Sequence, residues 1–202
     1  MSTVYLHEMR AAMYAKPGLV PIRLIRSALG AALGVESSNS ATTGFGAVLA
    51  ACIHERTEPM RRPLDTAAPI PQTRDALAKL LIEFGVSILK TVCSPEVLTV
   101  YRLAIAESDR APEIALTLHH SGREANLKTL AELLTKAQER RLVAAGDPTA
   151  LATRNFAALW GDLLLILLMR VREAPTEREI ETRACSATEK LMAWRKRCTN
   201  LS

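Results

Sequence analysis

Apolar residues recur at every third or fourth position along most of the chain from residue 73 onward, which is the spacing of a helix face. Thr73 is a suitable N-cap for a long amphipathic helix over 73–93. Ser94 and Pro95 then favour a new helix start, because serine caps helices and proline fits the first helical position. The pattern therefore predicts a second helix over 95–108.

The same start signal returns at Pro112, after which leucines continue at helical spacing to Leu134. Ser121-Gly122 is expected to kink or divide this stretch, because serine and glycine are weak helix formers. Arg140 and Arg141 suit the C-terminal end of the helix that follows, and Gly146 is a natural stop.

Asp147 and Pro148 predict the start of a helix that runs to about Arg172 and is apolar around much of its circumference over 159–169. Such a helix has to be covered on more than one side. A last helix, over 177–197, carries a single apolar face. Since no segment alternates like a half-buried strand, we expect an all-α fold.

The N-terminal part of the chain is less regular. A helix is expected over 46–58, ending before Pro59, and a proline-rich connection follows up to residue 72. These features divide the chain into a small helical head over 1–45, a linking helix and connection over 46–72, and a larger helical body over 73–202.

Composition narrows the class of protein. Apolar residues make up 49% of the 202 residues and aromatic residues only 4%, which favours helices, and the net charge of +5 is compatible with an anionic partner such as DNA. The longest apolar run, Leu163–Met169, is far shorter than the roughly 20 residues of a membrane span. The first ten residues do not resemble a secretory signal, so we expect a cytoplasmic protein without a membrane partner.

The sequence offers little for catalysis or metal binding. Its four cysteines lack metal-ligand spacing, and the adjacent His119 and His120 point about 100° apart on a helix. Nucleophile-elbow, nucleotide-loop and zinc-protease motifs are absent from the sequence. We expect neither an enzyme nor a bound metal or cofactor.

Three stretches, in matching order, resemble the TetR/AcrR family of transcriptional regulators, and in style its AefR-like members. Residues 94–124 contain a proline-started helix with Tyr101-Arg102-Leu103, followed by a Pro-Glu helix start. Residues 146–165 resemble the Asp-Pro start of the family's first dimer helix, and 46–64 resemble the helix that links head and body. The resemblance covers about three quarters of the chain and implies a TetR-like fold.

The head departs from the family pattern. Members carry a helix-turn-helix with an Ala-Gly-Val-Ser turn, which Ala32-Leu33-Gly34-Val35 matches only loosely, and residues 37–44 contain no basic or aromatic side chain for a recognition helix. Operator DNA would be contacted by the basic residues before position 54, which are Arg10, Lys16, Arg23 and Arg26. In the alternative, the head is degenerate and these are solvated charges.

The resemblance also implies a pocket in the body for a small hydrophobic ligand. The candidates for its wall are Phe84, Ile88, Tyr101, Ile105, Leu118, Leu130 and Trp160, with His119, His120 and Asn126 as polar anchors. For each apolar residue, ordinary core is the alternative.

Self-association follows from the apolar excess on the last two predicted helices, which two copies would bury in a four-helix interface. The alternative is a monomer that covers these residues internally. The candidates are Leu159, Leu163, Leu164, Leu167, Leu168, Ala184, Ala187, Leu191 and Trp194.

These expectations combine into a TetR-type regulator, a homodimer that binds operator DNA and is released by a small hydrophobic ligand. The first alternative is a TetR-like ligand-binding and dimerisation module that has lost DNA binding. The second is a helical scaffold that only pairs with partner helices.

Overall fold

The computed structural model describes residues 57, 59–64, 70–106, 108–109 and 112–193. No strand occurs among them, so the expected all-α fold is confirmed. The head, the expected linking helix up to residue 56 and the end of the last helix beyond Ala193 lie outside the described residues. The elements are η1 (Arg62–Leu64), α4 (Arg74–Val92), α5 (Pro95–Ala106), α6 (Pro112–Thr117), the π-helix η2 (Leu118–Glu124), α7 (Ala125–Glu139), α8 (Pro148–Trp160), α9 (Leu163–Leu168) and α10 (Glu177–Ala193).

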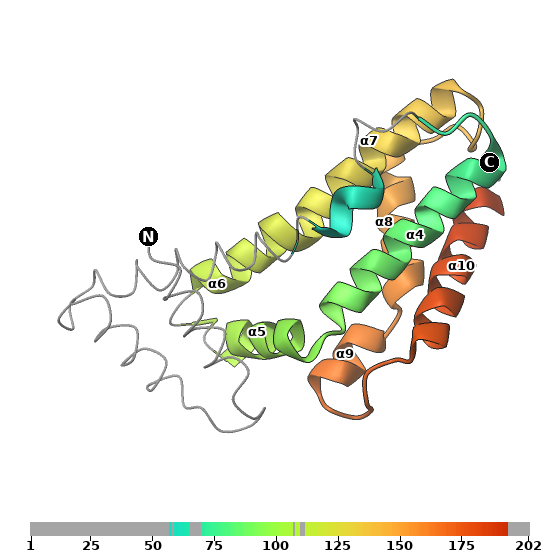
Figure 1. Cartoon of the computed structure of the whole chain (residues 1–202). Coiled ribbons are helices and arrows are strands. Elements are labelled where there is room, and N and C mark those ends of the chain that lie inside the picture. Colours follow the sequence, from blue (N-terminus) through green and yellow to red (C-terminus); the bar gives the residue numbers. More distant parts are fainter. Residues whose placement is uncertain (1–56, 58, 65–69, 107, 110–111, 194–202) are drawn as a thin grey trace, which may run out of the picture.

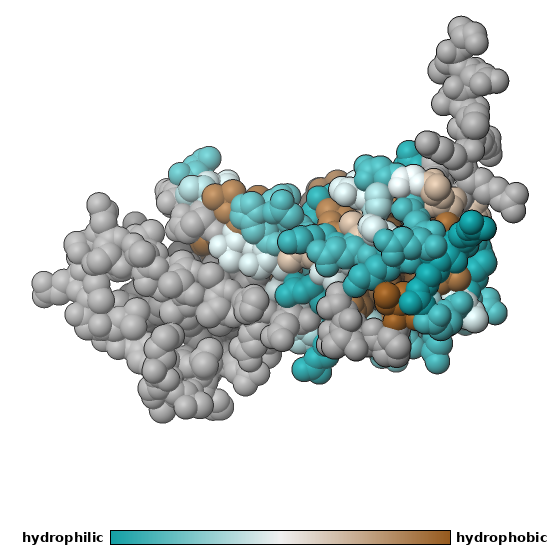
Figure 2. All heavy atoms as spheres, turned by 90° about the horizontal axis from the view of Figure 1, so that it is seen from above, coloured by the Kyte–Doolittle hydropathy of each residue, from teal (hydrophilic) through white to brown (hydrophobic). Residues whose placement is uncertain are grey.

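The long helices α7, α8, α10 and α4 form a layered bundle (Figure 1). In the order α7, α8, α10 and α4, each helix packs against the next. The shorter α5 and α9 contact each other at one end of this bundle, and α6 and η2 continue into α7 (Figure 1). Viewed from above, hydrophilic residues cover most of the described surface, and hydrophobic residues show between them in smaller areas (Figure 2).

The core is centred on α4, which is buried on several sides. Phe84 of α4 packs against Phe156 of α8, with ring centroids 6.3 Å apart and the rings tilted by 56°. Next to it, a Cβ on Gly85 would lie 3.1 Å from the Cβ of Ala184 in α10 and 3.3 Å from Leu159 Cδ1. The absence of a side chain at Gly85 therefore lets α4 and α10 approach closely.

Helix starts follow the caps expected from the sequence. Thr73 Oγ1 accepts a hydrogen bond from the Ala76 N–H at 3.1 Å. Asp147 Oδ1 accepts one from the Thr149 N–H at 3.0 Å, and Pro148 occupies the first helical position of α8. These local signals placed the beginnings of α4, α5, α6 and α8 correctly.

Two expected helix ends are wrong. The helix expected to stop before Pro59 does not end there, because residues 59–61 are helical, and the burial of Met60 and Leu64 offsets the hydrogen bond that proline removes. The helix that was to run from Asp147 to about Arg172 breaks at Gly161, whose φ of +49° separates α8 from α9.

The end of α7 also differs from the sequence expectation. The helix stops at Glu139 rather than near Gly146, because Arg141 adopts a left-handed φ of 58°. The Leu142 N–H then donates to Ala137 O, and the Arg141 N–H to Gln138 O, both at 2.9 Å. This is the Schellman arrangement, built here with arginine where glycine is usual.

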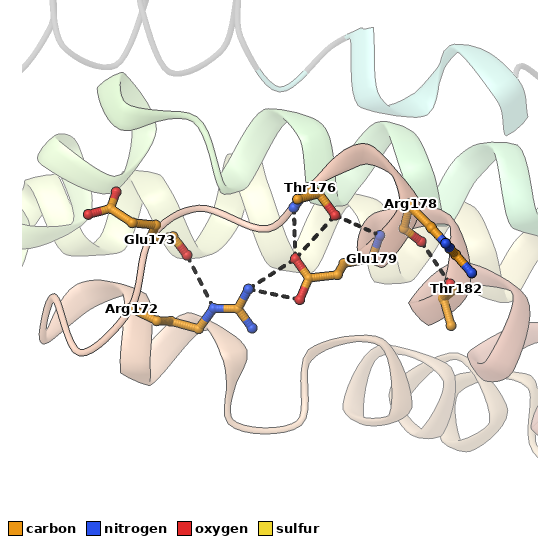
Figure 3. Close-up of polar contacts among 6 residues, drawn as sticks. All are labelled: Arg172, Glu173, Thr176, Arg178, Glu179 and Thr182. Carbon is orange, nitrogen blue, oxygen red and sulfur yellow. Dashed lines mark hydrogen bonds and ion pairs between the residues drawn. The ribbon is translucent and has the colours of Figure 1, made fainter.

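The loop between α9 and α10 is held by a capping box (Figure 3). The Thr176 N–H donates to Glu179 Oε2 at 2.8 Å, and the Glu179 N–H donates to Thr176 Oγ1 at 3.3 Å. Arg172 Nη2 binds both carboxylate oxygens, at 2.9 and 3.0 Å. These hydrogen bonds hold the pKa of Glu179 below its usual value, with the Thr176 backbone bond the largest cause.

The left-handed Arg141 gives a test of this helix end. Arg141→Gly should raise the free energy of unfolding by about 0.5–1 kcal/mol, because relief of the left-handed strain exceeds the added entropy of the unfolded chain. The matched control, Arg140→Gly, should lower it by about 0.5 kcal/mol, because Arg140 has an ordinary φ of −88°. Urea denaturation measures both, and destabilisation by Arg141→Gly would contradict the assignment.

Candidate ligand-binding cavity

A cavity of about 510 Å³ lies between α4, α5, η2, α8 and α9. Most of the side chains around it are apolar, which suits a small organic molecule. Its wall is formed by Thr57, Met60, Ile88, Val92, Val97, Tyr101, Leu118, Gly122, Arg123, Asn126, Thr153, Phe156, Ala157, Trp160, Gly161, Leu164, Leu165 and Leu168.

The break at Gly161 shapes one side of this cavity. It separates α8, which contributes Phe156 and Trp160, from α9, which contributes Leu164 and Leu168. Gly161 lines the cavity as well, so the break between the two helices lies in the cavity wall.

Arg102 of α5 fixes the C-terminal end of α9. Its Nε donates to Leu168 O at 3.0 Å, and its Nη2 donates to Leu167 O at 2.6 Å. Burial lowers the pKa of Arg102, and the nearby Arg170 lowers it further, yet a guanidinium stays charged at neutral pH. A cation at these terminal carbonyls stabilises the helix end and ties the cavity's α9 wall to α5.

The opposite side of the cavity is formed where η2 passes into α7. The π-helix occupies the Ser121-Gly122 position at which the sequence predicts a kink or division, so that expectation is confirmed. Asn126 follows η2 directly, is only 2% exposed, and donates from Nδ2 to Gly122 O at 2.6 Å. Arg61 Nη1 donates to Ser121 O at 3.3 Å, which joins η2 to the segment before η1.

Burial keeps the Tyr101 phenol and the Cys93 thiol in their neutral forms. Burial raises the pKa of the Tyr101 hydroxyl more than the nearby Arg123 lowers it, so the phenol remains protonated at neutral pH. Burial also raises the pKa of the Cys93 thiol to about 11, which leaves this buried cysteine unreactive.

Comparison with known proteins decides the family. The family model described as "AefR-like transcriptional repressor, C-terminal domain", one of the TetR family, matches residues 79–194, which is more than half of the chain. The chain belongs to the TetR family of transcriptional regulators. A search of curated proteins found no match.

Two solved structures share the TetR-family fold. One is the flavonoid-responsive regulator FrrA, with a TM-score of 0.60 and 25% identity over 81% of this chain and 82% of that one. The other is a TetR-family transcriptional regulator from Mesorhizobium loti MAFF303099, with a TM-score of 0.53 and 20% identity over 76% of this chain and 71% of that one.

The residues expected to form the ligand pocket divide into three groups in this TetR-family body. Ile88, Tyr101, Leu118, Asn126 and Trp160 line the cavity. Two others, Phe84 and Leu130, lie in the closed core at 1% and 0% exposure and are absent from the cavity wall. The remaining three, Ile105, His119 and His120, are exposed and do not line it.

Most residues expected at a dimer interface are covered within one subunit. Leu159, Leu163, Leu167, Ala184, Ala187 and Leu191 are buried in the main core, and Leu164 and Leu168 are half-buried and line the cavity, while Trp194 lies outside the described residues. The apolar excess that suggested pairing is therefore largely satisfied inside the subunit.

A separate groove remains on the outer face of α8 and α10. It has a volume of about 230 Å³, and its lining includes the small side chains of Ala158 and Ala187. Its lining consists of Leu151, Arg154, Asn155, Ala158, Ala187, Lys190 and Leu191.

Among the described residues, His119 and His120 form no metal site with their neighbours. His120 Nδ1 lies 2.5 Å from Glu124 Oε2 on the exposed side of η2, and this hydrogen bond lowers the pKa of Glu124. Within the part of the chain that the structure describes, no cluster of three metal-ligating side chains occurs. In that part, no helix has the length and apolarity needed to cross a membrane. The expected DNA contacts, Arg10, Lys16, Arg23 and Arg26, lie outside it.

Several cavity residues were missed at the level of sequence. Thr57 and Met60 line the wall, although the sequence placed Thr57 at the end of the linking helix and Met60 in the proline-rich connection. Val92 and Phe156 share the helix faces of the expected residues, so helical spacing from Ile88 and Trp160 was the signal that could have found them.

Proposed function

We propose that this TetR-family regulator is a homodimer that binds operator DNA and is released by a small, mainly apolar ligand bound in the cavity. The observation that carries the proposal is the composition of the cavity wall. Side chains of the body form most of it, and Thr57 and Met60 come from the segment that leads toward the N-terminal part of the chain. A bound ligand would therefore contact both the body and the segment that contains Thr57 and Met60.

The size and polarity of the cavity support a flat aromatic ligand. Its volume of about 510 Å³ falls within the range of small-molecule sites, roughly 300–1,000 Å³. The wall offers the ring faces of Phe156, Tyr101 and Trp160 for stacking. Since the structurally similar FrrA responds to flavonoids, we propose a flavonoid or a compound of similar shape.

Release from DNA would follow from a ligand that favours one arrangement of residues 57–61. Met60 is 2% exposed and Arg61 donates to Ser121 O, so this segment is in contact with the cavity wall. A ligand shifts this equilibrium only by its difference in affinity for the two arrangements, and DNA weakens ligand binding by the same factor.

The groove between α8 and α10 supports the homodimer. Ala158 and Ala187 let helices of a second copy approach closely, and a two-fold axis would place the same face on both subunits. Such a dimer would hold two heads at a fixed spacing, as recognition of two half-sites requires. We propose that it acts in the cytoplasm as a regulator and not as an enzyme.

Ala158→Arg should convert the dimer into a monomer, because a long cation on the groove floor prevents close packing of the partner's helices. The control, Thr135→Arg, adds the same charge to the exposed side of α7 and should leave the dimer intact. Light scattering after gel filtration measures both masses at micromolar concentration. A wild-type monomer, or a dimer that survives Ala158→Arg, would count against this interface.

The full-length protein should bind DNA from upstream of its own gene, with an affinity that falls steeply between 50 and 200 mM salt by roughly 10³-fold or more. Addition of 4′-hydroxyflavone should release the DNA. Fluorescence anisotropy with labelled DNA measures both effects, and a scrambled duplex is the control.

One observation favours the alternative, a ligand-binding module without DNA recognition: the sequence of the head departs from the family's helix-turn-helix pattern. The same experiment separates the two. Absence of DNA binding at low salt, with ligand binding intact, would establish the alternative and exclude the operator-binding role.

A further inference from the structure

Asn126 is a buried polar residue in the wall of an otherwise mainly apolar cavity. It is 2% exposed, and its Oδ1 has no hydrogen-bond partner within the described structure. We propose that the cavity selects ligands carrying a hydrogen-bond donor, such as a phenolic hydroxyl, and that Asn126 Oδ1 is the acceptor for it. This inference rests on the proposed function, because it concerns the ligand of the same cavity.

The orientation of the amide is fixed by its other end. Asn126 Nδ2 lies 2.6 Å from Gly122 O, a distance at which only the NH₂ group can face a carbonyl oxygen. Nδ2 also lies 3.6 Å from Met60 Sδ. Rotation of the amide by 180° would bring two acceptors together at Gly122, so the unpaired atom of this side chain is the oxygen.

The other polar groups of the wall make Asn126 distinctive. Arg123 can only donate, and Thr57, Tyr101 and Thr153 carry hydroxyls that can donate or accept. An amide oxygen can only accept, and it cannot adapt to an ether or carbonyl oxygen of a ligand. Because this oxygen is already buried without a partner, a ligand that donates to it gains a hydrogen bond that a ligand without a donor does not make.

The position of Asn126 links this choice of ligand to the rest of the molecule. The Asn126 amide contacts Met60 Sδ and donates to Gly122 O. Gly122 lies near Thr57, because a Cβ on Gly122 would be 3.9 Å from Thr57 Cγ2. A donor that pairs with Oδ1 therefore sits near Thr57 and Met60. Ligands with and without the donor would then make different contacts at the place where the body meets this segment.

The test uses matched ligands and the full-length protein. Isothermal titration calorimetry measures the dissociation constants of 4′-, 6- and 7-hydroxyflavone, of their methyl ethers and of unsubstituted flavone. At least one hydroxyflavone should bind the wild type roughly tenfold more tightly than its methyl ether and than flavone, since one lost hydrogen bond at a buried acceptor is worth about a factor of ten.

Two variants assign this preference to Asn126. Asn126→Leu keeps a similar volume without an acceptor and should bring the hydroxyflavone and its ether within about twofold, while flavone still binds. Tyr101→Phe, which removes a different polar group of the wall, should retain the preference. Circular dichroism checks folding, and Asn126→Ala replaces Asn126→Leu if the leucine variant does not fold.

Each outcome has a distinct meaning. Equal binding of hydroxyflavones and ethers by the wild type, or a preference that persists in Asn126→Leu, would overturn the inference and leave the proposed ligand cavity standing. Loss of the preference in Tyr101→Phe alone would assign the recognition to Tyr101 instead. If none of the flavones binds, the proposed ligand class fails, and the inference fails with it.

Discussion

The close approach of α4 and α10 at Gly85 and Ala184 sets the arrangement of the other helices. A Cβ on Gly85 would meet Ala184 at 3.1 Å, so any larger side chain would push the two helices apart. With α10 held against one face of α4, Phe84 packs on Phe156 of α8, and α8 in turn contacts both α10 and α7. This contact accounts for a bundle whose core is closed beside Phe84 and opens further along α4.

The cavity lies beside two interruptions in the helices that surround α4. Gly161 divides α8 from α9, and η2 widens the helical path before α7. Both interruptions border the cavity, together with Ile88 and Val92 of α4. Polar bonds stabilise these irregular sites, since Arg183 donates to Trp160 O at 3.3 Å and Arg102 binds the last carbonyls of α9.

Helix beginnings could be predicted from the sequence because their signals are local. Thr73, Ser94 and Asp147 each cap a helix within three residues of themselves. The exact helix ends could not, because Arg141 and Arg170 adopt φ values of 58° that their residue type disfavours.

The candidate site could be predicted only in part, for a related reason. Helical spacing identifies a buried face but cannot separate the part that meets a cavity, such as Ile88, from the part that meets another helix, such as Phe84. The apolar run 163–168 suggested an interface between subunits. In the structure this run forms α9 after the break at Gly161, and Leu163 and Leu167 are buried in the core of the same subunit. Met60 was not predicted because Pro59 and Pro63 near it indicated a connection and not a buried helix.

The central claim is that a ligand in the cavity acts directly on the segment that leads to the N-terminal part of the chain. Hydrogen exchange of the full-length protein, with and without saturating 4′-hydroxyflavone, tests it most directly. Peptides covering 57–64 and 118–126 should exchange more slowly with the ligand, while peptides covering the α8–α10 groove should change little. Ligand binding that leaves exchange at 57–64 unchanged would contradict the account.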